Sequence, residues 1–339
     1  MKHFLQGITL ICLITCAGYS LSAQSFLQYW GRPDVMLQEQ ASIVYEQSYK
    51  ILEKYPPTTQ VGDERKLALY ALDLLLHDIR LDNTAAFSSY INSMAQRVLD
   101  QLLKEKPAEG QTRFYRFYNH GFIVQTSTAT IAIDLVRGGT NDASIVNDSI
   151  MRAIVNQCDI LFVSHAHGDH ADVSVARMFW EQDKQVVIPQ GLWSDLSPNT
   201  TTLRGEKQTI ALKPSGTSLQ VTAYPGHQGS MINNLYVITL PNNRTIMHTG
   251  DQDNSEDLEL IATIGNNVKI DILLAHCWIR PTQVIIQSIN PSLVITGHEN
   301  EVAHTIDHRE AYWMTFLRMA NIGVPYVVMA WGESYCHGQ

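Results

Sequence analysis

The stretch His165-Ala166-His167-Gly168-Asp169-His170 places four potential metal ligands within one short segment of the chain. It follows the apolar run Ile160-Leu161-Phe162-Val163-Ser164, which is typical of a buried strand. His165 and His167 share a side, because alternate residues of an extended segment do so. Gly168 would let the loop turn sharply where side chains crowd. Ligands on a loop that a strand end fixes reach a metal with little ordering cost, so the sequence predicts a metal site here.

Three further candidate ligands come later in the chain, each directly after another apolar run: His227 in Tyr-Pro-Gly-His, Asp251 in His-Thr-Gly-Asp and His298 in Thr-Gly-His-Glu. Zinc accepts neutral imidazole and carboxylate ligands, and two ions about 3.5–4 Å apart can hold a hydroxide between them. His304 and His308 compete with His298 for its role, but the apolar run directly before His298 favours it. The set therefore predicts a two-metal hydrolytic site.

The candidate ligands divide into two sets. His165, His167 and His227 would bind the first ion, Asp169, His170 and His298 the second, and Asp251 would bridge both. Asp169 would also be the catalytic residue, because its carboxylate would orient the nucleophile as well as bind a metal. We expect two zinc ions, with iron or manganese as alternatives.

The composition describes an ordinary globular protein. The 339 residues can form one large domain or a domain with an appendage, with 45% hydrophobic and 17% charged residues. The net charge of −9, without a long run of Lys and Arg, argues against a nucleic-acid partner. The sequence contains no phosphate loop, no dinucleotide fingerprint and no Gly-x-Ser-x-Gly elbow. These absences disfavour nucleotide enzymes and serine hydrolases.

Residues 1–23 have the layout of a secretory signal peptide, with a basic start, an apolar stretch from Phe4 to Ala17 and small residues up to Ala23. The apolar stretch is too short to span a bilayer. An uncleaved anchor and a lipoprotein signal at Cys16 are the alternatives. We expect cleavage near Ala23 and export to the periplasm or the outside of the cell, with no membrane span afterwards. The remaining cysteines are too few for a disulfide framework: Cys158, Cys277 and Cys336.

Two segments of different periodicity follow. Residues 24–111 show helical spacing, with helices expected to begin near Asp63 and after Asn83-Thr84, and this extension should pack against the rest. Residues 112–339 alternate strands and helices, which indicates a layered α/β domain with its ligands gathered at one edge. Strands are expected near 114–117, 122–124, 130–135, 160–164, 185–188, 219–224, 234–240, 244–249, 269–274, 292–297 and 324–330. Helices are expected near 150–155, 171–183, 256–264, 281–288 and 307–320.

The motifs closely resemble those of the metallo-β-lactamase superfamily, whose signature is His-x-His-x-Asp-His after a strand. Ile131-Ala132-Ile133-Asp134 looks like the early strand of that family that ends in an aspartate. The later ligands also stand in the family's order. Within the superfamily, the Pro-Gly-His and His-Thr-Gly-Asp contexts are most similar to the branch that holds ascorbate-6-phosphate lactonase and N-acyl-phosphatidylethanolamine phospholipase D. The resemblance covers about residues 114–334 and leaves out the helical extension.

The resemblance implies a four-layer αββα sandwich with an N-terminal helical extension, and a role for Asp134 in holding the metal loop by hydrogen bonds. We expect an exported zinc hydrolase in which metal-bound hydroxide attacks an ester, lactone, amide or phosphodiester bond of a small-molecule or lipid-like substrate. Two other classes stay open. One is a persulfide dioxygenase with a single iron, since some relatives share the signature. The other is a non-catalytic metal-binding module that uses the extension.

Four other histidines have less definite roles. His248 precedes Asp251 on an expected strand and could orient a ligand or simply pack in the core. His276 could donate a proton at the rim of the site, although a neutral structural role is favoured. His77 and His120 have no partner that the sequence identifies.

Overall fold

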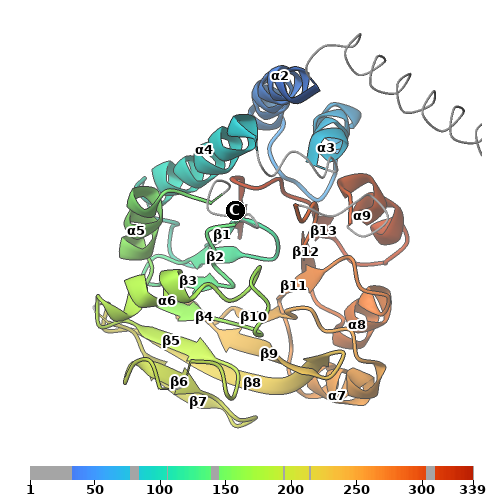
Figure 1. The fold of residues 1–339 in the computed structure, drawn as a ribbon. Helices are drawn as coiled ribbons and strands as arrows, with labels where there is room; N and C mark the ends of the chain where they lie inside the picture. Colours follow the sequence, from blue (N-terminus) through green and yellow to red (C-terminus); the bar gives the residue numbers. More distant parts are fainter. Residues whose placement is uncertain are drawn as a thin grey trace, which may run out of the picture.

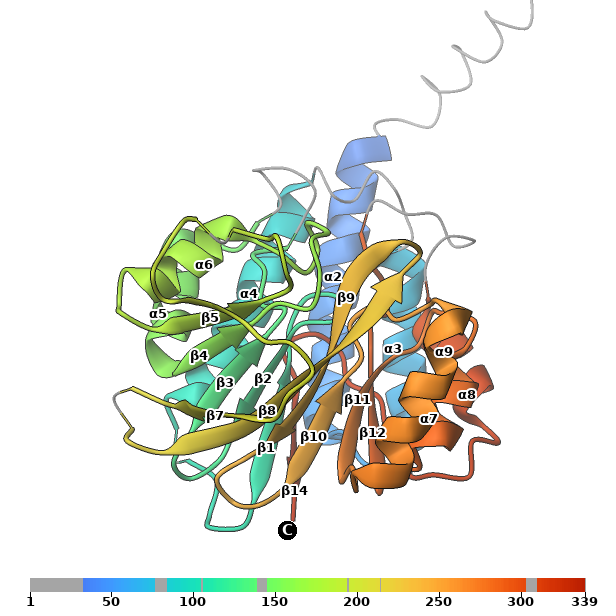
Figure 2. The same cartoon turned by 90° about the horizontal axis from the view of Figure 1, so that it is seen from below.

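Two mixed β-sheets pack face to face between outer layers of helices (Figures 1 and 2). The computed structural model describes residues 33–76, 84–104, 106–138, 145–193, 195–213, 215–302 and 310–338. The first sheet in these ranges has the order β14 (Ser334–His337), β1 (Thr112–Arg116), β2 (Phe122–Gln125), β3 (Thr130–Ile133), β4 (Ile160–Phe162), β5 (Gln185–Ile188) and β6 (Thr200–Thr202). The second has the order β13 (Tyr326–Val327), β12 (Leu293–Gly297), β11 (Ile272–His276), β10 (Thr245–His248), β9 (Met231–Thr239), β8 (Ser218–Gln228) and β7 (Gln208–Ala211).

The helices lie on the outer faces and at one end of the sandwich (Figure 2). The first sheet is covered by α4 (Ala85–Leu102), α5 (Asp148–Gln157) and α6 (Val173–Trp180). The second is covered by α7 (Leu258–Asn267), α8 (Thr282–Ile289) and α9 (Tyr312–Met319), with the short 3₁₀ helix η3 (Ser255–Asp257) before α7. At one end, α2 (Pro33–Lys54) lies between α4 and α3 (Asp63–Leu76). This is the αββα sandwich with a helical extension that the sequence predicts.

Alternation along the strands separates the apolar layers. On β1, Phe114 packs between the two sheets, whereas its neighbour Tyr115 packs with the helices. On β3, Ile131 and Ile133 face the second sheet and Ala132 faces the helices. Because successive side chains of a strand point to opposite faces, a strand that is buried on both sides reads as an unbroken apolar run. That is why these strands could be predicted from composition alone.

The helical extension shares its core with the first sheet. Tyr45 stacks on Tyr90 with ring centroids 4.0 Å apart, and Tyr90 lies 5.9 Å from the ring of Trp331, near the C-terminal end of the described chain. Arg65 of α3 binds both carboxylate oxygens of Glu333, at 2.8 and 2.6 Å, and both side chains are buried. Loss of one partner from such a pair leaves a buried charge without compensation, so the pair ties α3 to this segment.

Some expected elements differ from those observed. The strand expected at 324–330 is reduced to β13, at Tyr326–Val327, and β6, β7 and β14 were not predicted. These three strands are half-exposed and polar, with sequences such as Thr-Thr-Thr and Ser-Tyr-Cys-His, so they lack an apolar signal. The expected start of the last helix, at 307–309, lies outside the described residues, and the helix begins at Tyr312.

The signal sequence predicted at residues 1–23 also lies outside the described ranges. Within those ranges no helix has the length and apolar character that crossing a membrane requires. Cys158, Cys277 and Cys336 are all free thiols.

Parallel pairing sets the position of the candidate ligands. β3, β4 and β5 are parallel in the first sheet, and β10, β11, β12 and β13 are parallel in the second. Parallel strands end at the same edge of a sheet, and the two sheets face each other. The loops that follow β4, β10 and β12 therefore meet, and these loops carry most of the predicted ligands.

Candidate metal centre

The loop after β4 is held by a buried aspartate from the end of β3. Asp134 adopts a left-handed backbone (φ 47°) and accepts hydrogen bonds from the backbone N and Oγ of Ser164, at 2.7 and 2.6 Å. Its Oδ2 also accepts from His170 Nδ1 at 2.8 Å. The imidazole is thereby fixed with its other nitrogen, Nε2, directed away from the carboxylate. Asp134 thus holds the loop by hydrogen bonds, as the resemblance implies.

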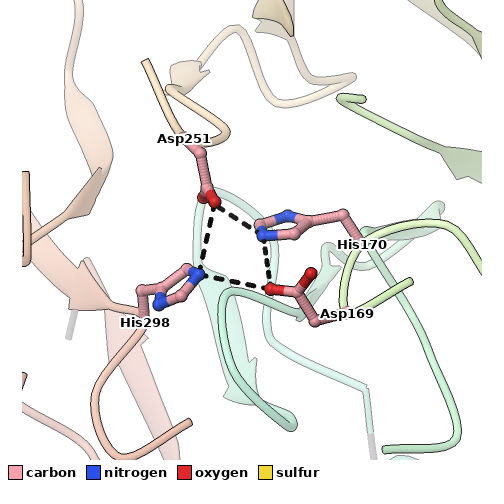
Figure 3. A group of neighbouring side chains, drawn as sticks. All are labelled: Asp169, His170, Asp251 and His298. Carbon is pink, nitrogen blue, oxygen red and sulfur yellow. Dashed lines mark ion pairs between the residues drawn. The ribbon is translucent and has the colours of Figure 1, made fainter. Parts of the chain in front are cut away.

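Four predicted ligands meet between the sheets: Asp169, His170, Asp251 and His298 (Figure 3). The His170 Nε2 atom lies 3.0 Å from Asp169 Oδ2 and 3.1 Å from Asp251 Oδ1. The His298 Nε2 atom lies 3.3 Å from Asp169 Oδ2 and 3.4 Å from Asp251 Oδ2. Two imidazoles and two carboxylates thus alternate around a common centre.

This centre fits a divalent ion of the zinc class. Ligand atoms about 2.0–2.2 Å from a tetrahedral ion lie roughly 3.3–3.6 Å from one another, close to the separations observed. His170 Nε2 and Asp251 Oδ1 are buried and neither makes a hydrogen bond, although they face each other. Buried polar atoms without hydrogen bonds are rare in folded proteins, and an ion at the centre would give both a partner.

The electrostatics also demand positive charge at this centre. Burial alone would raise the pKa of Asp251, but His170 and His298 lower it well below its usual value. Burial would likewise lower the pKa of His298, yet Asp251 and Asp169 raise it to about 10. The carboxylates therefore hold cationic partners in the protein alone. A metal ion can supply that charge and leave the imidazoles neutral, as metal ligands must be.

A second donor group adjoins the first and shares one residue with it. His165, His167 and Asp251 bring their donor atoms together, with His165 Nε2 at 3.2 Å from His167 Nδ1 and 3.7 Å from Asp251 Oδ2. Burial lowers the pKa of His165 to about 3, and the charge of His170 adds to the effect. A neutral imidazole results, which is the form that binds a metal. Asp251 lies in both groups, the place expected of a bridging ligand.

His227 lies in neither group. It is on the last turn of β8, its side chain is 36% exposed, and Nδ1 lies 3.2 Å from both carboxylate oxygens of Asp257. A carboxylate on one imidazole nitrogen is the usual way in which proteins orient a histidine that binds a metal through the other nitrogen. The structure therefore brings six of the seven predicted ligands together, and the role of His227 as the seventh stays a prediction.

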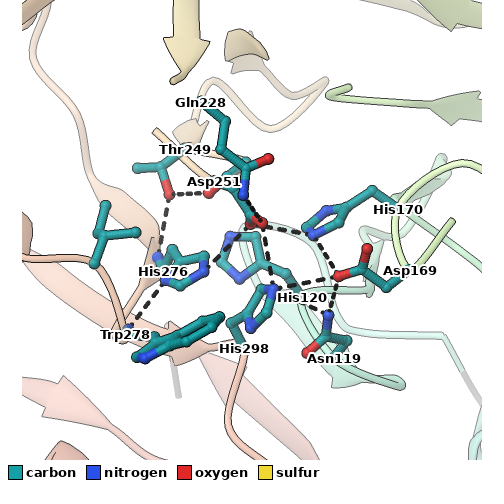
Figure 4. Close-up of polar contacts among 12 residues, drawn as sticks. Asn119, His120, Asp169, His170, Gln228, Thr249, Asp251, His276, Trp278 and His298 are labelled. Carbon is teal, nitrogen blue, oxygen red and sulfur yellow. Dashed lines mark hydrogen bonds and ion pairs between the residues drawn. The ribbon is translucent and has the colours of Figure 1, made fainter. Parts of the chain in front are cut away.

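Several residues that the sequence analysis did not select support the ligands (Figure 4). Asn119, in the turn between β1 and β2, has a left-handed backbone (φ 53°). Its Nδ2 donates to Asp169 Oδ2 at 2.5 Å and lies 3.0 Å from His298 Nε2. The turn-forming sequence Asn-His-Gly was the available signal, since Asn tolerates this conformation.

Asn233 has a comparable role on the second sheet. Its Oδ1 accepts from Asp251 N at 3.0 Å and its Nδ2 donates to Thr249 O at 2.9 Å, so this side chain fixes the loop after β10. Asn233 is fully buried in an otherwise apolar strand. Such a residue needs a specific partner, which is the signal that could have identified it.

Two histidines of uncertain role also lie at this centre. His276 Nδ1 accepts from Trp278 N at 3.0 Å, so the proton is on Nε2, which lies 3.4 Å from Asp251 Oδ1. Burial lowers the pKa of His276 well below its usual value, so the ring is neutral. His120, for which the sequence identified no partner, is buried with its ring centroid 4.2 Å from that of His248 and 5.7 Å from that of His276.

The glycine that the site requires is not the one expected. Gly168 has no left-handed backbone, and a Cβ there would meet no atom within 4 Å, so the expectation that a crowded turn needs it is wrong. Gly250, directly before Asp251, has φ 50°, and a Cβ there would lie 2.0 Å from Asn233 Oδ1. The crowded turn is therefore the one after β10.

Comparison with known proteins identifies the fold. No family model and no curated protein matches the sequence. Among solved structures, Igni18, described as a novel metallo hydrolase from Ignicoccus hospitalis, matches with a TM-score of 0.54 at 16% identity over 68% of this chain and 99% of its own. An isothiocyanate hydrolase from Delia radicum gut bacteria matches with a TM-score of 0.51 at 13% identity, over 66% of this chain and 98% of its own.

A possible metal-dependent hydrolase from Veillonella parvula matches with a TM-score of 0.50 at 14% identity, over 66% of this chain and 99% of its own. At such identities the likeness shows the fold alone. The metallo-β-lactamase fold predicted from the sequence motifs is thereby confirmed. The narrower resemblance to the lactonase and phospholipase D branch stays a prediction.

Proposed function

We propose that this chain is an exported hydrolase that depends on two metal ions, with zinc as the expected metal. The observation that carries the proposal is the position of Asp251 in two donor groups at once, 3.1 Å from His170 Nε2 and 3.7 Å from His165 Nε2. A carboxylate shared by two ions is a common feature of sites that hydrolyse esters and phosphodiesters. Export is supported by the signal-like pattern of residues 1–23.

The residues of the site have distinct tasks. When bound, the two ions would supply Lewis acidity and lower the pKa of water to near neutrality. Asp169 receives the Asn119 amide on Oδ2, so its carboxylate is fixed in an orientation suited to position the attacking water. His276 directs its Nε2 proton toward Asp251 and keeps that carboxylate in place. Trp278 lies beside His276 and His298, with ring centroids 6.2 and 5.8 Å away, and offers a flat apolar surface next to the reacting bond.

The expected substrate is a small or lipid-like molecule with an ester, lactone, amide or phosphodiester bond. The Pro-Gly-His and His-Thr-Gly-Asp contexts support this range, because they are most similar to the lactonase and phospholipase D branch. The isothiocyanate hydrolase of the same fold adds isothiocyanates to the substrates worth testing. The apolar face of Trp278 favours substrates with an apolar group beside the scissile bond.

The test begins with demetallated protein that is reloaded with zinc, manganese or iron in parallel. Elemental analysis should give two ions per chain for the zinc form, and a panel of chromogenic esters, lactones, amides and phosphodiesters should reveal turnover. Asp251→Ala should lose both ions, since it removes the shared ligand. Asp253→Ala is the matched control: it is exposed, lies on the same loop and belongs to neither donor group, so it should keep both ions.

Other outcomes would select the alternatives. A single iron together with oxygen uptake on a persulfide substrate would indicate the dioxygenase. Two ions without turnover of any substrate class would favour the non-catalytic module. A plateau at one zinc would mean that the two donor groups serve one mononuclear site.

A further inference from the structure

The loop after β12 carries His298, and three consecutive residues of this loop are held by three separate parts of the chain. The partners are Asn119 for His298, Arg116 for Glu299 and Asp73 for Asn300. The first two partners belong to the first sheet and its β1–β2 turn. The third belongs to α3, in the helical extension. A segment without a counterpart in the metal-binding motifs thus contacts the loop that carries a candidate ligand.

Asp73 makes this contact with a fully used carboxylate. Its Oδ1 accepts from Asn300 Nδ2 and from Tyr312 N, both at 2.8 Å, and its Oδ2 accepts from Trp313 N at 3.1 Å. The two backbone donors are at the start of α9, whose N-cap residue Ala311 provides no side-chain acceptor. Asp73 therefore caps α9 from another helix, and α3 and α9 lie side by side (Figure 1).

The loop needs such support because of its backbone conformation. His298 and Asn300 both have left-handed backbones, with φ of 74° and 61°. Residues with a side chain rarely adopt this conformation, and it persists only where the surroundings enforce it. His298 Nε2 meets Asp169 and Asp251 only in this arrangement. Release of Asn300 would let the loop relax and would move the imidazole out of its group.

We propose that Asp73 is a positioning residue of the metal centre, through which the helical extension holds His298 in the group with Asp169, His170 and Asp251. This inference rests on the proposed function, since it takes that group to bind an ion. The group with His165 and His167 has its own support from Asp134 and Ser164 in the first sheet. Asp73 thus acts on the ion at His298 and leaves the ion at His165 alone.

The test titrates demetallated full-length protein with Zn²⁺ alone and follows binding by calorimetry. Asp73→Asn keeps the shape of the side chain but turns an amide donor toward groups that also donate, so the contact to Asn300 is lost. We expect one of the two zinc affinities to fall by about 10–100-fold, the range seen when an orienting partner of a ligand is removed, and the other to stay unchanged. Asn300→Ala, which removes the same bond from the other side, should weaken the same ion.

Leu75→Ala is the matched control. Leu75 is a buried residue of α3 two positions from Asp73, and it packs in the core of the extension. This variant should lower the melting temperature and keep both zinc affinities, which separates loop positioning from loss of stability. Two wild-type affinities in Asp73→Asn, or loss of the same ion in Leu75→Ala, would overturn this inference alone. A wild-type protein that binds no zinc would overturn the proposed function and this inference with it.

Discussion

The loops after β4 and β12 bring ligands to the same centre but are built in opposite ways. The β4 loop carries four candidate ligands in one contiguous motif, and its main anchor, Asp134, comes from the neighbouring strand of the same sheet. The β12 loop carries one, His298, and depends on partners from the β1–β2 turn, from β1 and from α3. A motif with local support can be recognised in a sequence, whereas a ligand with distant support becomes evident only in the fold.

The largest effect should come from the β4 loop. Asp169→Ala should lower hydrolysis by on the order of 10³-fold or more, because it removes both a metal ligand and the group that orients the water. Its melting temperature should change little, since no apolar core depends on this side chain. Turnover, metal content and melting temperature of the purified variant would be measured together, and full activity would contradict the mechanism.

His304→Ala is the control for the other loop. His304 is near His298 in sequence, lies outside the described residues and is not assigned to a metal. This variant should keep most activity and both ions. Metal loss here would instead move the sixth ligand to His304.

The β12 loop should be sensitive to a residue far from the motif. Arg116 and Glu299 are both fully buried and pair at 3.1 Å. Arg116→Met would leave Glu299 as a buried charge without its partner, so the free energy of unfolding should fall by about 3–5 kcal/mol. Arg152→Met breaks an exposed pair with Glu181 and should cost less than about 1 kcal/mol. Denaturant midpoints that shift equally in both variants would show that the buried pair does not support this loop.

Two glycines test whether crowding is confined to one loop. Gly250→Ala should destabilise the protein by about 1–3 kcal/mol, because the turn has a positive φ and the new Cβ would collide with Asn233. It should also weaken metal binding, since Asp251 is the next residue. Gly168→Ala, within the signature itself, should have nearly wild-type stability. Urea unfolding of both variants provides the measurement, and the reverse ranking would refute the assignment of the crowded turn.

The smallest effect should be a pH dependence from behind the β12 loop. Burial raises the pKa of Glu310 to about 8, against the effect of Arg318. The folded protein therefore binds a proton at Glu310 in a pH range where the unfolded chain has released it. Stability should fall as the pH rises from about 4.5 to about 8, by on the order of 1–2 kcal/mol from this group. Glu310→Gln cannot titrate, so it should match the wild type at pH 5 and exceed it at pH 9 in urea unfolding.

The sequence predicted those parts of the molecule whose signal is local. Apolar runs such as Ile160–Phe162 are buried on both faces, so they could be recognised, and the ligands that follow them share an edge because the strands are parallel. The half-exposed Ser334–His337 strand pairs with β1 through backbone hydrogen bonds that any sequence can make, and it was missed. Asn233 and Asp73 act only because another segment lies beside them, which no periodicity reports.

The edge of the first sheet has a consequence for the synthesis of the protein. β14 pairs with β1, and Glu333, directly before β14, binds Arg65. These C-terminal residues leave the ribosome after every other described strand. Until then, β1 has an unpaired outer edge and α3 has a buried arginine without its carboxylate. Unpaired strand edges on nascent chains invite association with other chains. A ribosome that stalls shortly before residue 333 would therefore hold a nearly complete chain in its most aggregation-prone state.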